Sequence, residues 1–316
     1  MQHNRSLRHF AIMDLGGTKA EAILFREDGK ILSRIVRAGG TPFEDGPEKA
    51  RDNAISVVRE LLSGGDVPVS ALYCSIASVH FYQSYFDEGF RSAFPQIGAI
   101  RLEADGMCLI SGMLGHNDGA SMICGTGSAL FMRKGEEYWN IGGGGHLIDS
   151  CGSGFMLGRL AIQAALRADD GSADSTILGD LIREKAGKAI WKELTSIYAG
   201  GRPYVASFAP CVFQARNAGD HVARRIFNRC AADLADLTWA AREKLGGGYT
   251  LVLNGGIFHN FPEYANAVKA GAPKDVNIIL SNVPPIYGCA VEALYDLGLS
   301  CSDDFRETFL SCYNHI

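Results

Sequence analysis

The pattern of apolar and polar positions in the first part of the chain predicts three strands before any helix. Phe10–Met13 is a short apolar run, Ala20–Arg26 alternates behind a glycine turn, and Ile31–Arg37 follows the turn Glu27–Lys30. An Asp-Gly pair in such a turn is typical of a β-hairpin. A dinucleotide-binding fold would place a helix directly after its first strand, so this meander disfavours one.

Helical spacing first occurs in Pro47–Ser63, where apolar residues recur every three or four positions before Gly64-Gly65. A glycine pair after the last periodic residue is an ordinary helix stop. Further strands are expected at Leu72–Val79, Ala99–Glu103, Ala120–Ile123, Ala129–Arg133, Tyr138–Gly142, Tyr249–Asn254 and Val276–Leu280. Further helices are expected at Phe86–Phe94, Phe155–Arg167, Ile177–Glu184, Ile190–Tyr198, Ala218–Lys244, Phe261–Ala270 and Tyr287–Leu297, the last of which closes the fold.

These elements form two similar rounds of strand, glycine turn, strand, turn, strand, helix and strand. No low-complexity linker separates the rounds, which predicts an α/β protein of two lobes packed around a cleft. We expect an N-terminal lobe over residues 1–113, joined by a closing helix over 286–300, and a C-terminal lobe over 114–285.

Composition narrows the class of protein. Hydrophobic residues make up 47% and charged residues 21%, which is ordinary for a globular domain and excludes intrinsic disorder. The net charge of -5 argues against a nucleic-acid coat or a polybasic membrane binder. Glycine is in excess, with 38 of 316 residues where average usage is about 7%. The backbone is therefore expected to approach something closely at several places.

Nine cysteines are scattered along the chain, and none forms a C-x-x-C pair. This spacing indicates reduced thiols rather than a disulfide framework, a zinc site or an iron–sulfur cluster. The apolar run His9–Met13 stops at Asp14 and is too short for a signal peptide, and Val67–Phe86 is too polar to span a membrane. We expect a cytoplasmic protein with no nucleic-acid or membrane partner and, by default, a homodimer.

Two glycine turns carry the candidate chemistry. Gly16-Gly17-Thr18-Lys19 follows Asp14 at the first hairpin, and Gly125-Thr126-Gly127-Ser128 occupies the equivalent hairpin of the second round. Facing turns of this kind offer backbone N–H groups and hydroxyls to a polyphosphate. A carboxylate at Asp14 suits Mg²⁺ held through water. Lys19 fits either a phosphate neighbour or a solvent-facing strand position. The P-loop and dinucleotide fingerprints are both absent.

At these residues the chain resembles the N-acetylglucosamine kinase branch, or BadF/BadG/BcrA/BcrD ATPase family, of the sugar kinase, Hsp70 and actin superfamily. The resemblance implies a duplicated ribonuclease-H-like (actin-like ATPase) fold that binds ATP and Mg²⁺ in the interlobe cleft. It spans nearly the whole chain in the right order, through Asp14–Lys19, Ile123–Ser128, Gly142–Arg159, Phe208–Ala223, Leu251–Gly256 and Pro285–Leu294.

The resemblance also implies site residues. A catalytic base is expected at Asp105, in the segment Leu102–Gly106 after the last strand of the first lobe. Gly255 and Gly256 are expected to lie against the nucleoside of ATP, with Asn254 nearby. The candidate acceptor site for a small-molecule sugar comprises Gly144, Gly145, His146, Asp149 and Ser150.

The acceptor segment departs from the family pattern. Where relatives carry G-D-E-G-S, this chain has Asp149-Ser150-Cys151-Gly152-Ser153, and Ala129 replaces a sugar-contacting Asn of animal members. We therefore expect an ATP-dependent sugar kinase whose acceptor is N-acetylglucosamine, glucosamine or a related sugar. Two alternatives stay open: an ATPase that activates a partner enzyme, and a sugar sensor that has lost turnover.

Overall fold

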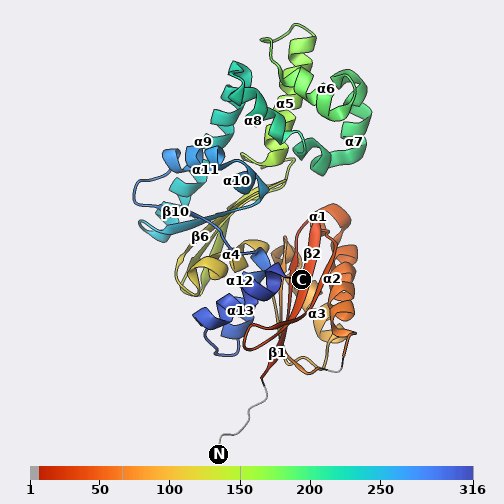
Figure 1. Ribbon diagram of the computed structural model, residues 1–316, viewed down its shortest axis with the longest axis vertical. Coiled ribbons are helices and arrows are strands. Elements are labelled where there is room, and N and C mark those ends of the chain that lie inside the picture. The colour runs from red at the N-terminus through yellow and green to blue at the C-terminus, as the bar shows by residue number, and fades with distance from the viewer. Residues whose placement is uncertain (1–6, 66, 150, 316) are drawn as a thin grey trace, which may run out of the picture. The chain divides into compact units, whose positions relative to one another are not determined.

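The computed structural model describes residues 7–65, 67–149 and 151–315. It divides into two compact units, one formed by Met1–Asn117 together with Ser281–Ile316 and the other by Asp118–Leu280. Each unit is built around one five-stranded mixed sheet. Figure 1 shows the C-terminal helices, in blue, returning to the sheet that the N-terminal strands begin.

The sheet of the first unit has the order β3-β2-β1-β4-β5. Its first three strands form an antiparallel meander, whereas β4 and β5 run parallel to β1. The carboxyl ends of β1, β4 and β5 therefore share one edge of the sheet. The strands are β1 (His9–Leu15), β2 (Lys19–Arg26), β3 (Ile31–Ala38), β4 (Val69–Ile76) and β5 (Ala99–Glu103).

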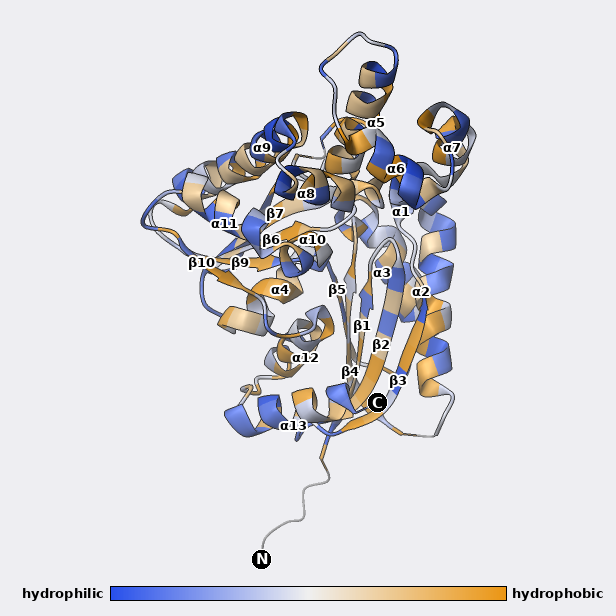
Figure 2. Cartoon of the chain, turned by 45° about the horizontal axis from the view of Figure 1, so that its top comes forward, coloured by the Kyte–Doolittle hydropathy of each residue, from blue (hydrophilic) through white to orange (hydrophobic). Residues whose placement is uncertain are grey.

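Helices cover both faces of this sheet. One face packs against the apolar sides of α2 and α3, and the other packs against α12 and α13. The aromatic contacts of Phe25 with Phe305 and Phe309 tie α13 to the sheet, with ring centroids 5.8 and 5.6 Å apart. Figure 2 shows both hydrophilic and hydrophobic positions along α2, and the buried ones are Ala50, Ala54, Ile55, Val57, Val58 and Leu61. The helices are α1 (Pro42–Asp45), α2 (Pro47–Leu62), the 3-10 helix η1 (Val79–Tyr82), α3 (Gln83–Ala93), α4 (Asp105–Leu114), α12 (Pro285–Tyr295) and α13 (Asp303–Asn314).

The second unit repeats this topology. Its sheet has the order β10-β9-β6-β7-β8, with β6, β7 and β8 antiparallel and β9 and β10 parallel to β6. Strand β6 thus takes the place of β1, and β9 takes the place of β4. The strands are β6 (Gly119–Cys124), β7 (Ser128–Lys134), β8 (Glu137–Gly142), β9 (Thr250–Asn254) and β10 (Asn277–Leu280).

Helices of the second unit surround a core of their own, in which α5, α8, α9 and α11 pack together. The long helix α9 begins where the Asp220 carboxylate accepts a hydrogen bond from Ala223 N–H, and it ends at Gly246 in a left-handed conformation. The helices are α5 (Gly154–Asp169), α6 (Leu178–Ala186), α7 (Ile190–Ala206), α8 (Ala209–Asn217), α9 (His221–Leu245), α10 (Gly256–Asn260) and α11 (Pro262–Gly271).

The α/β duplicated fold class expected from the sequence is confirmed, but several element predictions are wrong. Strand β4 ends at Ile76 rather than at Val79, because η1 begins there. Helix α4 was not predicted, since it is apolar on nearly every side and shows no amphipathic spacing. The helix at Tyr287–Leu297 does not close the fold, because α13 follows it. Among the described residues, no helix combines the length and apolar character needed to cross a membrane.

Candidate functional site

The first glycine turn connects β1 to β2 and is held from behind by the backbone. Gly39 N–H donates to Thr18 O and Gly40 N–H donates to Gly16 O, both at 3.0 Å, while Gly16 N–H donates to Lys19 O at 2.9 Å. A Cβ at Gly39 would collide with the backbone of Gly16 and Lys19, so only glycine permits this approach. The carbonyls of the turn thus point back into the unit, and Gly17 and Thr18 are exposed.

The side chain of Lys19 extends from this turn toward the sheet, where it pairs with Glu21 of β2. Its Nζ lies 2.8 Å from Glu21 Oε2, and Glu21 is 1% exposed. Arg34 holds the other oxygen of the same carboxylate at 2.7 Å. Tyr313 of α13 also donates to Glu21, at 3.3 Å. The amino group of Lys19 is therefore occupied by an ion pair that braces the first turn against β3 and the C-terminal helix.

Asp14 is the second-last residue of β1 and is partly buried. Its Oδ1 accepts a hydrogen bond from Ser75 Oγ at 3.1 Å, and Ser75 is its register partner on β4. Burial and, to a smaller extent, repulsion by Asp105 raise the pKa of Asp14 to about 7, although the Ser75 hydrogen bond opposes this shift. This carboxyl group is costly to ionise without a cation nearby.

Asp105 is the first residue of α4, two positions after the end of β5. Burial raises its pKa to about 6, although the backbone N–H groups at the start of the helix stabilise the ionised form. The helix is fixed by a close crossing with α12, where a Cβ at Gly288 would overlap Cys108 O. A hydrogen bond from Ser111 Oγ to the buried Glu292 carboxylate adds to this crossing. Asp105 therefore projects from a rigid element.

Asp14 and Asp105 together give the carboxyl edge of the first sheet an acidic character. Within the described residues, no group of three or more His, Cys, Asp and Glu side chains could hold a metal ion. Mg²⁺ commonly uses only one or two carboxylates and takes its other ligands from phosphates and water. Two carboxyl groups that resist ionisation suit this mode of binding, because a cation would relieve both burial and repulsion.

The second glycine turn connects β6 to β7 and repeats the arrangement of the first. Gly154 N–H and Phe155 N–H, at the start of α5, donate to Gly125 O at 2.8 Å and Thr126 O at 3.0 Å, and Gly125 N–H donates to Gly127 O at 2.9 Å. All three carbonyls are thus turned inward. Among the described residues, no backbone hydrogen bond uses the amide of Thr126 or Gly127. Outward amides and inward carbonyls are the composition of an anion-binding nest.

Ser128, the last predicted residue of this turn, has a different role from its neighbours. Its Oγ donates to Cys151 O, and the side chain is nearly buried. The hydroxyl therefore fastens the acceptor segment to the second turn. Two residues after Cys151, the Ser153 side chain caps α5 by accepting a hydrogen bond from Met156 N–H at 3.2 Å. This cap fixes the start of α5 next to the acceptor segment.

The glycine segment after β8 is open to solvent in part. Asp149 N–H donates to Gly145 O at 2.8 Å, and Asp149 Oδ1 accepts from Cys151 Sγ at 3.1 Å. Burial and the Asp149 carboxylate raise the pKa of Cys151 to about 11, so the group remains a thiol donor. His146 packs edge-on against Phe155, with ring centroids 5.1 Å apart. Gly144 is exposed. Ser150 lies outside the described residues.

Gly255 and Gly256 follow β9 at the carboxyl end of the second sheet. Gly255 has φ 106°, and a Cβ there would overlap Cys124 at the end of β6. Its bare α-carbon therefore already serves close packing beside the second turn. A Cβ at Gly256 would meet only Asn260, at 3.7 Å. Asn254 is 7% exposed, and its Nδ2 has no hydrogen-bond partner in the described structure.

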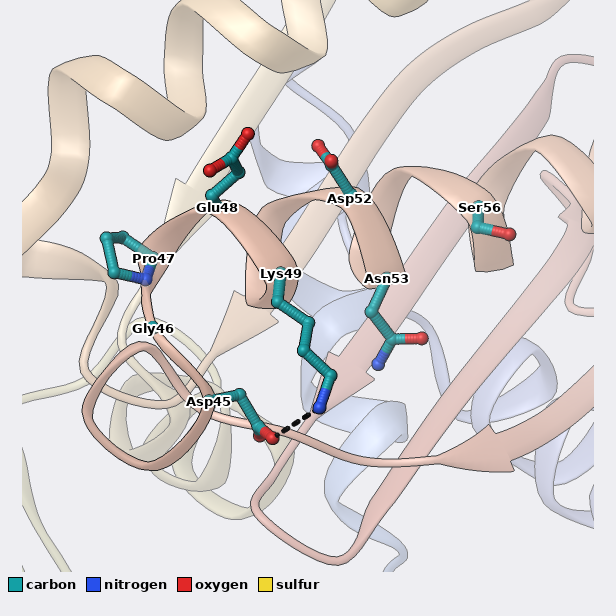
Figure 3. A pocket seen from close by; sticks show the side chains of 8 residues that line it. All are labelled: Asp45, Gly46, Pro47, Glu48, Lys49, Asp52, Asn53 and Ser56. Carbon is teal, nitrogen blue, oxygen red and sulfur yellow. Dashed lines mark hydrogen bonds and ion pairs between the residues drawn. The ribbon is translucent and has the colours of Figure 1, made fainter.

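A surface hollow on α1 and α2 contains none of the predicted site residues (Figure 3). Three of its side chains are acidic, and its one lysine, Lys49, pairs with Asp45 at 3.1 Å. This charge makes the hollow unsuitable for a polyphosphate. Its lining residues are Asp45, Gly46, Pro47, Glu48, Lys49, Asp52, Asn53 and Ser56.

Each unit brings its own predicted residues together. In the first unit, Asp14 and Asp105 lie at one sheet edge with the turn Gly16–Lys19; in the second, Gly125–Ser128 lies beside Gly255. Sequence reasoning missed Ser75, which was hidden in an apolar strand, and Arg202, whose guanidinium lies against Gly127. Arg202 and Gly127 are far apart in the sequence, and the residues around Arg202 form no recognisable motif.

Comparison with known proteins adds independent evidence. The model of the BadF/BadG/BcrA/BcrD ATPase family matches residues 13–293. The chain is 25% identical to the glucosamine kinase GspK of Vibrio cholerae, over 82% of this chain and 88% of that protein. It is 26% identical to the N-acetylmuramic acid/N-acetylglucosamine kinase of Clostridium acetobutylicum, over 89% of this chain and 96% of that protein.

A solved structure shares the fold. It is a protein of Porphyromonas gingivalis described as a candidate N-acetylglucosamine kinase, and it superposes with a TM-score of 0.71 at 20% identity. The match covers 92% of this chain and all of that one. At this level of identity the likeness supports the two-sheet architecture and the order of its strands.

Proposed function

The chain belongs to the BadF/BadG/BcrA/BcrD ATPase family, and from this premise we propose that it is an ATP-dependent kinase that phosphorylates a hydroxyl of an amino sugar. The acceptor we propose is glucosamine, N-acetylglucosamine or a closely related sugar, in keeping with the names of its two relatives. The observation that carries this proposal is the repeated turn. In both units, carbonyls of the loop after the first strand accept backbone hydrogen bonds, whereas the amides of Gly17 and Thr18, and of Thr126 and Gly127, donate none among the described residues.

The two units are proposed to act as the two lobes of the kinase. The turn Gly16–Lys19 and the turn Gly125–Ser128 would bind the phosphates of ATP through their backbone amides, with Thr18 and Thr126 adding hydroxyl donors. Gly255 and Gly256 would accommodate the nucleoside. Because the Lys19 amino group is held by Glu21, its contribution would be to brace the loop rather than to contact phosphate.

Mg²⁺ would be held at Asp14, through water, and when bound it supplies positive charge to the phosphates. The chain's own residues fit this ion, because Ser75 holds one Asp14 oxygen in place while burial and the neighbouring Asp105 disfavour an uncompensated charge. Asp105 would accept the proton of the acceptor hydroxyl. Its pKa of about 6 keeps it ionised at neutral pH yet basic enough to take a proton.

The acceptor sugar is proposed to bind at Gly144, Gly145, His146 and Asp149, with Ser150 as a further candidate. Asp149 is oriented by the Cys151 thiol, and His146 is backed by Phe155. A carboxylate and an imidazole are suitable partners for the hydroxyl and amino groups of a sugar. Cys151 stands where relatives carry Glu, so it would help set the choice among amino sugars.

We further propose that the enzyme works in the cytoplasm on a free sugar. All nine cysteines are free, and most are buried, which suits a reducing compartment. The homodimer expected from the sequence stays a prediction, and light scattering of the purified protein tests it.

An acceptor screen tests the function. ADP release from MgATP is measured with glucosamine, N-acetylglucosamine, N-acetylmuramic acid and no sugar. We expect release that depends on an amino sugar and falls about 10²–10⁴-fold in Asp105→Asn. Asp52→Asn, an exposed carboxylate of the same unit, is the control and should keep the wild-type rate. Sugar-independent release would instead identify an activator-type ATPase, and sugar binding without release would identify a sensor.

A further inference from the structure

Arg202 lies directly against the second glycine turn. A Cβ built on Gly127 would be 2.5 Å from Arg202 Nη2, so the guanidinium occupies the space that any other residue at Gly127 would fill. Both residues belong to the second unit, although 75 positions separate them in the sequence. The contact places a permanent positive charge beside the amides of Thr126 and Gly127, which donate no backbone hydrogen bond in the described part of the chain.

The backbone around Arg202 is built to hold this position. Helix α7 is interrupted at Gly201, which has φ 55° and ψ -148°, and Pro203 follows immediately. A positive φ of this kind favours glycine. The break turns the chain so that Arg202 leaves the helix line toward Gly127, while a regular helix would continue its hydrogen bonding through this point.

Contacts across the break make it rigid. Tyr204 Oη donates to the Glu193 carboxylate, which is 1% exposed and also lies 3.1 Å from Lys188 Nζ. Glu193 belongs to the part of α7 before the break, and Tyr204 belongs to the part after it. The two parts are thereby locked to each other, and Arg202 lies between them. The Nε of Arg202 is buried, and its Nη2 lies against Gly127.

From this geometry we propose that Arg202 is a further catalytic residue, which contacts the terminal phosphates of ATP at the second turn and stabilises the charge of phosphoryl transfer. The planar fork of a guanidinium matches two phosphate oxygens at once. Phosphoryl transfer depends mainly on positioning and charge stabilisation, so a cation at this place acts on the reaction itself. The proposal deepens the kinase function above and rests on it for the catalytic part.

The two glycine turns differ in the cation that lies beside each of them. The amino group of Lys19, the cation beside the first turn, is paired with Glu21. The other predicted site side chains of that unit that can carry a charge, Asp14 and Asp105, are both carboxyl groups. An arginine on the second turn would supply the protein's own positive charge to a nucleotide that carries several negative charges.

Substitution of Arg202 tests the proposal. We expect Arg202→Met to lower kcat for sugar-dependent ADP release by more than 100-fold, and Arg202→Lys to recover part of the loss. We expect the affinity for the non-hydrolysable analogue AMPPNP to fall at least 10-fold more than the affinity for ADP, both measured by calorimetry with Mg²⁺. Arg183→Met is the matched control, since Arg183 is an exposed arginine of α6 that pairs with Asp180 at the surface, and it should change neither quantity.

The outcomes separate this proposal from the function it deepens. Wild-type kcat in Arg202→Met, or equal losses of AMPPNP and ADP affinity, would overturn the role of Arg202. A loss confined to the KM of the sugar would overturn it as well, because it would assign the guanidinium to the acceptor. If the wild-type protein shows no turnover with any sugar, the proposed function fails, and the difference between AMPPNP and ADP affinity still decides whether Arg202 binds the terminal phosphate. Circular dichroism of each variant confirms that α7 is intact.

Discussion

Replacing Asp105 by Asn should make the protein more stable and less active, and the gain in stability should depend on pH. The carboxyl group is partly buried, and its pKa in the folded chain is about 6 against an ordinary value of 3.8. Between these values the folded state holds a proton that the unfolded state has lost, so stability falls as the pH rises. Asn is uncharged at every pH and avoids this loss.

The size of the effect follows from the two pKa values. At about 1.36 kcal/mol for each pH unit between them, the ionised carboxylate costs about 3 kcal/mol of unfolding free energy at pH 8. At pH 4.5 the folded group is almost fully protonated, and the same linkage leaves a cost of about 1 kcal/mol. The advantage of Asp105→Asn should therefore grow by about 2 kcal/mol from pH 4.5 to pH 8.

Urea unfolding measures this advantage, in chelator and without nucleotide so that no cation neutralises the site. Wild type and Asp105→Asn are compared at pH 4.5, 6 and 8, with Asp52→Asn as an exposed control that should show no gain at pH 8. ADP release under MgATP should be nearly abolished in Asp105→Asn, while ATP affinity is retained. An advantage that does not change with pH, or an Asn variant less stable than wild type at pH 8, would refute the assignment of a buried and costly carboxylate.

Three further predictions follow from the same contacts. Asp14→Asn should also raise stability at pH 8, and the gain of the double variant with Asp105→Asn should be smaller than the sum of the single gains, because each single change already relieves the mutual repulsion. Gly39→Ala should lower the unfolding free energy by about 1–3 kcal/mol and weaken ATP binding, because its Cβ meets the backbone of the first turn, whereas Gly64→Ala, with open space around it, should weaken neither. Cys151→Ala should raise the KM of the sugar several-fold and leave the KM of ATP unchanged, since it removes the donor that orients Asp149, and Cys151→Ser should restore the wild-type value.

The sequence was sufficient for the architecture because the elements that define it have regular patterns. The antiparallel meander β1–β3 and its copy β6–β8 alternate or run apolar between clear turn residues, and the order of the two rounds could be read directly. Helix α13 also had local signals, since Ser302 caps it and Asp303 and Asp304 occupy its first turn. Helix α4 had none, because burial on nearly every side removes the polar face that periodicity requires.

The site residues also divide into those that have a local sequence signal and those that have none. Turn residues such as Gly16 and Gly125 could be found because a hairpin turn, a hydroxyl and a motif coincide in a few consecutive positions. The excess of glycine was a weaker guide, since it predicts close approach of the backbone at several places without indicating what is approached. Gly39 and Gly255 show a second use, in which a missing Cβ lets the backbone of one segment pack against the turn or strand end of another. Such a glycine shapes the binding loop without facing any ligand.

Arg202 shows why some functional residues remain hidden at the sequence level. Nothing next to it in the chain resembles a phosphate motif, and the Gly200-Gly201 and Pro203 neighbours read as an ordinary helix break. Its position depends on the packing of α7 against α5, on the Tyr204–Glu193 contact across the break and on the absence of a side chain at Gly127. The glycine of the turn thus has two roles: it frees an amide for an anion and makes room for a guanidinium. If both roles serve the same phosphate, Gly127→Ala should displace Arg202 and lower kcat as Arg202→Met does, and the two changes combined should cost little more than either alone.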